Sequence, residues 1–531
     1  MTWSHPLRMT DRRTRLFRSA DRWERWRAVQ GRVFTKVLRD TMKLQKYKDT
    51  IRSKHKEKNF MDFIEDVCSW YPLRMYKNWA LYWVYPDNGR HAPFISQETF
   101  EANRESLPSF SYDEKKSFFD QFTYLFRAIQ LPGFHHYYSV ENSEYSNHIS
   151  STSHAYSSFH VTGDCERVMY SLSTKIYAKN VYNSVMTWIY SENVYQSLGT
   201  IRSMNVYYSK YIQDSHDIWF SSDLIGCSEC IFCHDQANIS YAIDNVIYPK
   251  EIYEAKKQEI LSRRWEFDHY YAVLAPLGKS RGSSRTTGKY CSQSEDVENG
   301  NYSIHVKNGK NILFTGHPDG LSDVYNSLFV SAGSGYYGAC GVGGDSEEIY
   351  NSISIMRSFE CYYSYFLERC SFCIGCVGLK NKSYCILNKQ YTQDEWYIVA
   401  EKIFASMEAS NTLWEYFPGE ICPFYIEDSL AGMMLGDIGK SSLSEKWFLI
   451  SGKSDNDTSS LVDAISSESL SHYEQIAGGN YTIDASILSK IVKDKQWRLY
   501  TIQPMERDFL MKHGLPLPRS HWMQRMTQNL Q

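Results

Sequence analysis

The chain has 531 residues, a net charge of -3, and 42% hydrophobic and 22% charged residues. This length favours two or more domains, and this balance excludes a mostly disordered chain. No uncharged apolar run approaches the roughly 18 residues of a membrane span, and the N-terminus has Arg and Trp where a signal peptide needs an apolar stretch. The 13 Cys residues are too sparse for a disulfide scaffold and odd in number, so the sequence predicts a protein of the reducing cytoplasm.

The first 58 residues are strongly basic. They hold 18 Lys or Arg against 6 Asp or Glu, so their net charge is +12 and that of the remaining chain is -15. From residue 10 to residue 58 there is no Pro and one Gly, and apolar residues recur at spacings of three and four. This pattern predicts one or two amphipathic helices. We therefore expect a basic helical arm over residues 1–60, which either binds a polyanion or docks on the acidic remainder of the chain.

The arm is the main candidate for a binding function. Its Arg and Trp residues cluster at Arg12, Arg13, Arg15, Arg18, Arg22, Trp23, Arg25, Trp26 and Arg27. Guanidinium groups neutralise phosphates, and indole rings stack on unpaired bases. A nucleic acid or a ribonucleoprotein is therefore the expected partner. Two alternatives remain: a helix docked on its own body with the Trp residues as core contacts, and a helix on a membrane surface.

An internal repeat dominates the rest of the sequence. A five-residue pattern recurs, as in residues 193–197 and 205–209. It consists of a polar, an aliphatic, an aromatic and a variable residue, followed by Ser. The aliphatic position recurs at spacings of 13, 13, 12, 12 and 12, at Val168, Val181, Val194, Val206, Ile218 and Cys230, and returns at Val324, Ile349, Cys361 and Cys373. Such short strand units bury their apolar edges only by stacking. The sequence thus predicts a parallel β-solenoid whose unit is either one very small coil or half of a coil near 25 residues.

The solenoid is duplicated. Residues 227–233 and 370–376 lie 143 positions apart, and each run is followed by a matching segment and a helix expected to cap the solenoid. The expected fold is mainly β, with small α+β terminal regions. The domains expected in chain order are the arm (1–60), a small mixed α/β region (61–136), a first solenoid with its capping helix (137–270), a linker or loop region (271–320), a second solenoid with its capping helix (321–410), and a C-terminal region with a degenerate ribbon-like end (411–531).

Two Cys-x2-Cys-x2-Cys runs suggest metal chemistry. Thiolates at this spacing could hold zinc, and the candidate ligands are Cys227, Cys230, Cys233, Cys370, Cys373 and Cys376. In the repeat register, however, these positions coincide with those that neighbouring units fill with Val, Ile or Ser. Packing as small buried residues is therefore the preferred interpretation, with zinc binding as the alternative.

Paired acids could support an enzyme. Asp217 and Glu229, and Asp323 and Glu348, fall in one repeat column. Such columns could line a polysaccharide groove of a β-helical carbohydrate-active enzyme. Other units have Asn in the same column, so a polar ladder is the simpler interpretation. An enzyme is accordingly less expected than a binding protein.

The C-terminal half resembles a family of uncharacterised Cys-repeat proteins from candidate-phyla bacteria, in which β-solenoids combine with terminal zinc ribbons. Residues 370–391 and 506–519 carry the resemblance. His521 and Gln524 stand where the family has a Cys-x2-Cys pair, and residues 5–8 look like a similar remnant without Cys. The resemblance thus implies degenerate ribbons without zinc and carries over no activity. The sequence favours a non-enzymatic scaffold that binds nucleic acid through its arm, with a protein–protein scaffold using the Tyr-rich solenoid faces as the alternative.

Overall fold

The structure, a computed structural model, describes residues 31–73, 76–77, 83–84, 89–133, 135–274, 278, 280–450, 463–477 and 480–530. The fold is mainly β, with 41% strand and 30% helix, and its parallel β-solenoid has about 20 turns of a 12-residue repeat. The fold class expected from the repeat is therefore confirmed.

Two strands per turn build the first solenoid. Its strands are β3 (His136–Glu141), β4 (Asn147–Tyr156), β5 (Phe159–Met169), β6 (Leu172–Lys175), β7 (Lys179–Tyr182), β8 (Val185–Trp188), β9 (Glu192–Tyr195), β10 (Leu198–Ile201), β11 (Met204–Tyr207), β12 (Lys210–Gln213), β13 (His216–Trp219), β14 (Ser222–Ile225), β15 (Ser228–Ile231), β16 (His234–Ala237), β17 (Ser240–Ile243) and β18 (Val246–Ile247). Even-numbered strands from β6 to β16 pair in parallel on one side, and odd-numbered strands from β7 to β17 pair on the other.

One repeat unit is one complete coil. Val206 pairs with Val194 and with Ile218, each 12 residues away, whereas Val168 pairs with Val181 at a distance of 13 residues. The structure thus decides between the two geometries that the sequence left open. Stacked coils place equivalent residues directly above one another, which explains why the sequence pattern is so regular.

A shorter period of three residues lies within each coil. In the coil that follows β10, positive φ angles of 56°, 49°, 61° and 49° occur at Asn205, Tyr208, Tyr211 and Asp214. Left-handed backbone every third residue turns the chain four times per coil. The residue after each bend points inward, so Val206, Ser209, Ile212 and Ser215 are buried.

Serine columns satisfy the polar backbone inside the coils. The hydroxyl of Ser209 donates to the carbonyl of Tyr207 at 2.8 Å and accepts from the backbone N–H of Ser221 in the next coil at 3.1 Å. The same arrangement joins Ser184 to Ser197 and Ser197 to Ser209. Because buried donors and acceptors need partners, Ser is suited to these columns, while Val, Ile and Leu fill the apolar columns between them.

The second solenoid begins earlier than the sequence suggested. Its strands are β19 (Ser284–Ser292), β20 (Glu295–Val330), β21 (Gly333–Val342), β22 (Ser346–Met356), β23 (Phe359–Tyr362), β24 (Tyr365–Glu368), β25 (Ser371–Ile374), β26 (Ser383–Ile386) and β27 (Lys389–Gln390). The predicted linker or loop region over residues 271–320 is therefore wrong from residue 284 onward. Gly300 and Gly309 take inward positions where a Cβ would meet atoms at 2.6 Å and 2.4 Å. They stand among the inward residues Val297, Val306 and Ile312 and interrupt the pattern that reveals the repeat.

A helix follows the last coil of each solenoid, as expected. Short antiparallel pairs, β17 with β18 and β26 with β27, end the two ladders. Helix α6 (Lys250–Ser262), followed by η3 (Arg264–Glu266) and α7 (Phe267–Ala272), contacts β17, and α8 (Gln393–Ala409) contacts β26. A capping box starts α8, in which the side chains of Thr392 and Glu395 each accept a hydrogen bond from the other residue's backbone N–H. These helices cover the otherwise open sheet edges.

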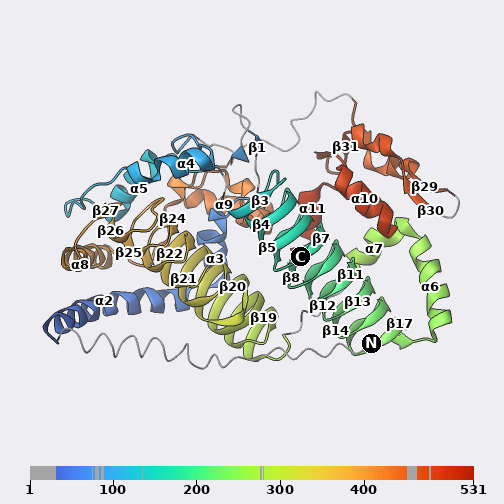
Figure 1. The fold of residues 1–531 in the computed structure, drawn as a ribbon, viewed down its shortest axis with the longest axis horizontal. Helices are drawn as coiled ribbons and strands as arrows, with labels where there is room; N and C mark the ends of the chain where they lie inside the picture. The colour runs from blue at the N-terminus through green and yellow to red at the C-terminus, as the bar shows by residue number, and fades with distance from the viewer. Residues whose placement is uncertain are drawn as a thin grey trace.

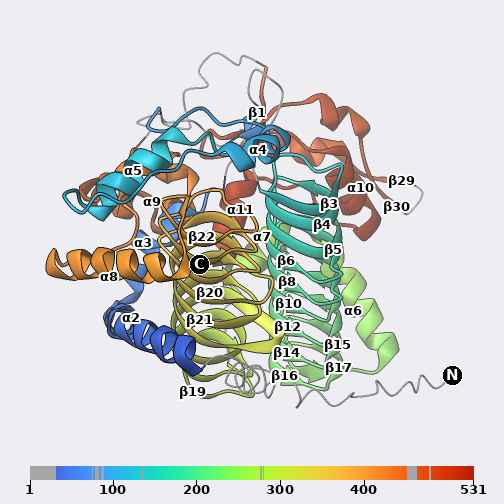
Figure 2. The same cartoon turned by 60° about the vertical axis from the view of Figure 1, so that its left-hand side comes forward.

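The two solenoids lie side by side and run in opposite directions (Figures 1 and 2). In the seam between them, Tyr211 stacks on Tyr290 with ring centroids 4.9 Å apart, and His160 stacks on Phe329 at 4.3 Å. Higher residue numbers in the second solenoid therefore meet lower numbers in the first. This antiparallel arrangement brings the last coils of the second solenoid beside the first coils of the first.

Lys175 is a buried lysine in this seam whose ammonium group lacks a hydrogen-bond partner among the described residues. Its side chain is 4% exposed. It lies 4.5 Å from the ring centroid of Trp188. Burial lowers the pKa of Lys175 to about 7, because the charged form loses its hydration.

We expect Lys175→Met to stabilise the protein by about 1–4 kcal/mol at neutral pH, since an apolar side chain of similar length removes the desolvation cost. The folded-state pKa lies below the unfolded value, so the wild type should gain stability as the pH rises from 7 toward 10.5. Urea denaturation at pH 7 and pH 9 measures both effects. A variant that is less stable at pH 7, or that keeps the pH slope, would refute this account of Lys175.

Of the remaining segments, α2 lies beside the lower half of the second solenoid in Figure 2, and most of the others pack around the upper part of both solenoids. The N-terminal ones are α2 (Gly31–Glu57), α3 (Phe60–Asp66), η1 (Cys68–Trp70), β1 (Tyr76–Lys77), β2 (Trp83–Val84), α4 (Gln97–Asn103), η2 (Arg104–Ser106) and α5 (Phe118–Ala128). The C-terminal ones are η4 (Gly419–Ile421), η5 (Ile426–Asp428), α9 (Leu430–Glu445), β28 (Ile465–Ser466), η6 (Ser467–Tyr473), β29 (Glu474–Ala477), β30 (Asn480–Ile483), η7 (Ala485–Ser489), β31 (Val492–Lys493), β32 (Leu499–Tyr500), α10 (Pro504–His513) and α11 (Trp522–Leu530). Buried residues of the region 61–136 share one apolar core with both solenoids and α8.

Candidate functional site

The nine Arg and Trp residues predicted to bind nucleic acid, from Arg12 to Arg27, lie outside the described residues. The C-terminal half of the arm is described, and it docks on the second solenoid through α2. Lys48 forms an ion pair with Glu360, and Arg52 Nη2 lies 2.6 Å from Glu348 Oε2. Both acids belong to the outer polar column of the second solenoid. This half of the arm therefore behaves as a clamp on the chain's own body, the alternative that the charge asymmetry left open.

His55 fixes the end of this clamp. It is fully buried, and its Nε2 lies 2.9 Å from Asn351 Oδ1 while its Nδ1 lies 3.0 Å from Asn326 Nδ2. An amide N–H donor on one side and an amide oxygen acceptor on the other match a neutral imidazole with its proton on Nε2. Burial lowers the pKa of His55 to about 3. The clamp thus depends on an uncharged histidine.

The acidic columns are occupied by basic groups of the same chain. Besides Glu348 and Glu360, Glu229 of the first solenoid lies 2.6 Å from Lys257 of the capping helix α6. Asp217 accepts from Asn205 Nδ2 at 2.9 Å. Asp323 and Glu348 do line one cleft of about 460 Å³, but Arg52 and Lys56 line it as well, and Arg52 is paired with Glu348. This geometry favours the structural interpretation over a carbohydrate-active site.

An asparagine ladder follows the same outer column of the first solenoid. Asn180 donates to Asn193, Asn193 to Asn205, and Asn205 to Asp217, each at 2.9 Å. Arg167 extends the ladder by donating from Nε to Asn180 Oδ1 at 2.6 Å. The polar ladder predicted from the repeat is therefore present, and it ties successive coils together from outside.

Two rows of Tyr on the solenoid faces are covered by the chain itself. On the first solenoid, Tyr182 and Tyr195 are about 1% exposed and stack on Phe509 of α10. On the second, Tyr337, Tyr350 and Tyr362 form a stacked row under α2, with centroids 5.4 Å and 4.8 Å apart. These Tyr residues belong to internal cores. Tyr177 and Tyr190 of the first solenoid, however, stack with ring centroids 5.0 Å apart and are 45% and 65% exposed, so the alternative scaffold hypothesis stays a prediction.

The two Cys runs fill inward positions of single coils. Their spacing of three equals the inward period, so Cys227, Cys230 and Cys233 face the interior of one coil, and the same holds for Cys370, Cys373 and Cys376. Cys373 pairs in register with Cys361 above and Cys385 below. Contact with neighbouring thiols raises the pKa of Cys373 well above its ordinary value, which disfavours a thiolate at this position. The hydrogen bond with Cys230 instead lowers the pKa of Cys227 to about 6.

Hydrogen bonds show what the Cys side chains do. Cys233 Sγ lies 3.5 Å from the carbonyl oxygens of Ile231 and Ala242, the contacts that Ser makes elsewhere in this column. No group of three or more His, Cys, Asp and Glu side chains in the described part of the chain is arranged to hold a metal ion. The preferred interpretation of the runs, small residues packed in a stack, agrees with this geometry.

A buried carboxylate organises the region of the predicted degenerate ribbon. Asp494, between β31 and β32, accepts from the backbone N–H groups of Gln496 and Arg498 at 2.9 Å through Oδ1. Its Oδ2 accepts from the N–H of His521 at 3.1 Å. The side chain therefore joins the hairpin turn to the segment in which the resemblance places the lost Cys pair.

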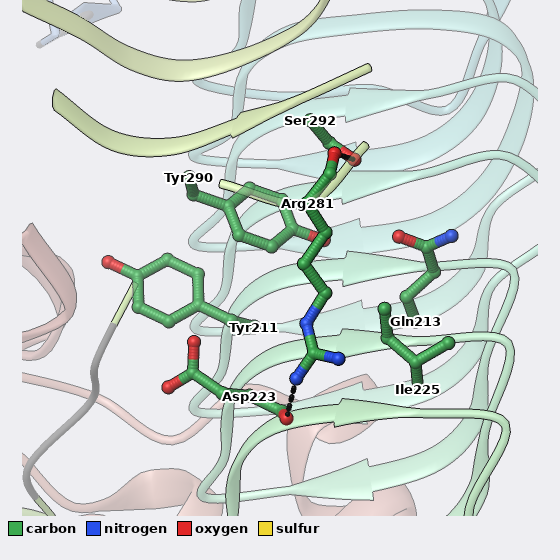
Figure 3. A pocket seen from close by; sticks show the side chains of 7 residues that line it. All are labelled: Tyr211, Gln213, Asp223, Ile225, Arg281, Tyr290 and Ser292. Carbon is green, nitrogen blue, oxygen red and sulfur yellow. Dashed lines mark hydrogen bonds between the residues drawn. The ribbon is translucent and has the colours of Figure 1, made fainter. Parts of the chain in front are cut away.

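The small cavity in the seam is occupied by an arginine rather than shaped for a ligand (Figure 3). It measures about 10 Å³, enough for one water molecule. Arg281 reaches across it and donates from Nη2 to the carbonyl of Asp223 at 2.9 Å, beside the rings of Tyr211 and Tyr290. The contacts of Arg281 in this cavity help to hold the two solenoids together.

Comparison of the chain with protein-family models, curated proteins and solved structures found no match. Within the described ranges, no helix is both long enough and apolar enough to cross a membrane.

Proposed function

We propose that the protein is a non-enzymatic binding scaffold that engages nucleic acid or a ribonucleoprotein through the basic arm of residues 8–58. The proposal depends on the observation that the cations of the arm fall into two groups, one paired with acids of the second solenoid and one that precedes the paired group in the sequence. Lys48 and Arg52 are committed to Glu360 and Glu348 of the second solenoid. The seven Arg residues from Arg12 to Arg27 precede this anchored half in the sequence.

The anchoring of α2 limits which cations of the arm are offered for binding. Ion pairs and a buried histidine hold α2 to the solenoid and engage its cations Lys48 and Arg52, so the proposal assigns the phosphate contacts to the Arg residues that precede α2 in the sequence. Cations concentrated within a short segment neutralise several neighbouring phosphates together. Membership of the Cys-repeat family stays a prediction and adds no activity to this proposal.

The test uses the full chain in two variants of equal charge. In the first, Arg12, Arg13, Arg15, Arg18, Arg22, Arg25 and Arg27 are changed to Gln. In the control, seven exposed cations of the body are changed to Gln: Lys115, Lys116, Arg263, Arg285, Lys307, Lys402 and Lys495. Fluorescence anisotropy with labelled single-stranded RNA and duplex DNA gives the affinities.

We expect the arm variant to bind at least about 100-fold more weakly than the wild type, since seven phosphate contacts are lost. The control should lose far less, because its cations are dispersed. If both variants lost the same affinity for nucleic acid, the loss would be due to net charge alone, and the proposal would fail. Unchanged binding of the arm variant would also contradict it.

A further inference from the structure

A cleft on the first solenoid, remote from the arm, carries unsatisfied hydrogen-bond donors. It measures about 540 Å³ and lies between the outer polar column and helix α10. His154, Arg167 and Asn180 line the solenoid wall, and Lys512 and His513 line the helix wall. Figure 1 shows α10 lying across the strands around β7. This volume falls in the range of small-molecule sites.

The floor of the cleft is rigid and aromatic. Tyr182 and Phe509 stack with centroids 4.2 Å apart, and Phe509 packs against the His513 ring at 4.5 Å. His513 Nδ1 lies 2.8 Å from Tyr207 Oη, which fixes the orientation of the imidazole. Groups held in this way are preorganised and lose little entropy when a ligand binds.

Four donors that line the cleft have no hydrogen-bond partner among the described residues. They are Arg167 Nη2, Tyr182 Oη, Lys512 Nζ and His513 Nε2. The Nε2 atom is also buried. Burial lowers the pKa of His513 to about 4, so the ring is neutral. In the tautomer in which the Tyr207 hydroxyl donates to Nδ1, the ring proton lies on Nε2 and Nε2 is a donor.

The charge of the cleft favours an anion. Arg167 and Lys512 stand on opposite walls, and the one carboxylate in the lining, Asp508, lies 3.1 Å from Arg507 Nη1. Glu166 pairs with Arg167 and with Lys179. The four cations of this group (Arg167, Lys179, Arg507 and Lys512) outnumber its two carboxylates (Glu166 and Asp508) by two. The cleft bordered by the unpaired donors therefore has a local excess of positive charge.

We propose that this cleft binds a phosphate-bearing ligand. A phosphate offers three or four acceptor oxygens to N–H and O–H donors, and charge-assisted hydrogen bonds to Arg and Lys are the strongest of these contacts. The cleft is larger than a phosphate ion needs, so it accommodates the organic part of a nucleotide over the Met505 side chain. The same chemistry is presented by a free nucleotide and by the backbone of a single strand.

The experiment measures binding of inorganic phosphate, AMP and an unlabelled single-stranded RNA by calorimetry. The protein is the full chain in the background of the seven-Arg variant, so that arm binding does not contribute. Lys512→Glu and Arg167→Gln change the two walls, and Tyr182→Phe removes one donor hydroxyl with little change of volume. Lys495→Glu, 81% exposed, is the matched control. Thermal melting verifies that each variant is folded.

We expect AMP to bind, with affinity reduced at least about tenfold by Lys512→Glu and by Arg167→Gln, because each removes a charge-assisted hydrogen bond. Lys495→Glu should leave it unchanged. If RNA alone binds and the cleft variants weaken it, the ligand is a strand. No binding of the three probes at about 10 mM, or binding that the cleft variants leave unaffected, would overturn the proposal. Because the seven Arg residues of the arm are replaced in this assay, failure here leaves the proposed function standing.

Discussion

Lowering the pH from 7 to 5 is expected to destabilise the protein strongly, through histidines that are buried without charge. Burial lowers the pKa of His148 and of His55 to about 3. An unfolded histidine takes up a proton near pH 6.5, whereas these two stay neutral until far lower pH. The unfolded state therefore binds more protons, and stability falls as the pH drops below 6.5.

The size of the effect follows from the pKa difference. At pH 5 each of the two histidines costs roughly 2 kcal/mol relative to pH 7. His135 and His160, whose pKa values burial also lowers, act in the same direction. Their surroundings in the seam offer cations and other histidines, namely Arg104, His136 and Lys175. Such a loss is a large share of the 5–15 kcal/mol that stabilises an ordinary domain.

Urea denaturation between pH 7 and pH 5 measures this dependence in a range where ordinary carboxylates stay ionised. His148→Asn should flatten the profile by about one protein-bound proton. His216→Gln, at an exposed position, is the control and should leave the profile unchanged. A wild-type stability that is constant from pH 7 to pH 5 would contradict the neutral histidine seam.

Arg525→Met is expected to cost about 3–5 kcal/mol, because it leaves a buried carboxylate without its cation. Arg525 of α11 and Glu506 of α10 are 5% and 0% exposed, with Nη1 3.1 Å from Oε1. This pair holds the two C-terminal helices against the Tyr-rich face of the first solenoid, where Arg525 also lies 5.5 Å from the ring centroid of Tyr170.

The double variant Arg525→Met/Glu506→Gln should recover most of the lost stability, since no uncompensated charge remains. As an exposed control, Arg285→Met breaks the pairs with Asp296 and Glu295 on the solenoid surface and should change stability far less. Thermal and chemical denaturation of the four proteins gives the comparison. A loss at Arg525 no larger than at Arg285 would show that the buried pair is not a principal contact.

The repeat was predictable because each coil repeats one pattern of inward and outward residues. The Val and Ser positions around residues 193–209 indicated the strand character and the parallel stacking, and the matching segments 227–233 and 370–376 indicated the C-terminal ends of both solenoids. The inward period of three was overlooked, although the spacing of Cys227, Cys230 and Cys233 displays it. Its recognition would have extended the second solenoid back through Gly300 and Gly309, where no side chain marks the inward position.

The docking of separate segments was not predictable from the repeat. The sequence indicated a basic arm and an acidic body, and the structure shows that Lys48, Arg52 and His55 join them. The partners of these residues lie about 300 positions away, and a pattern of local spacing carries no information on such pairs. The cleft of Arg167 and Lys512 was overlooked for the same reason, because its walls come from distant parts of the chain.

The salt dependence of RNA affinity tests the central claim most directly, that the arm binds nucleic acid while its second half is anchored to the solenoid. For seven phosphate contacts on a single strand, the logarithm of the association constant should fall with the logarithm of salt concentration with a slope of about -5. In the seven-Arg variant the slope should approach zero, while the body-cation control keeps the wild-type value. A wild-type slope near zero, or an equally steep slope in the seven-Arg variant, would contradict the claim.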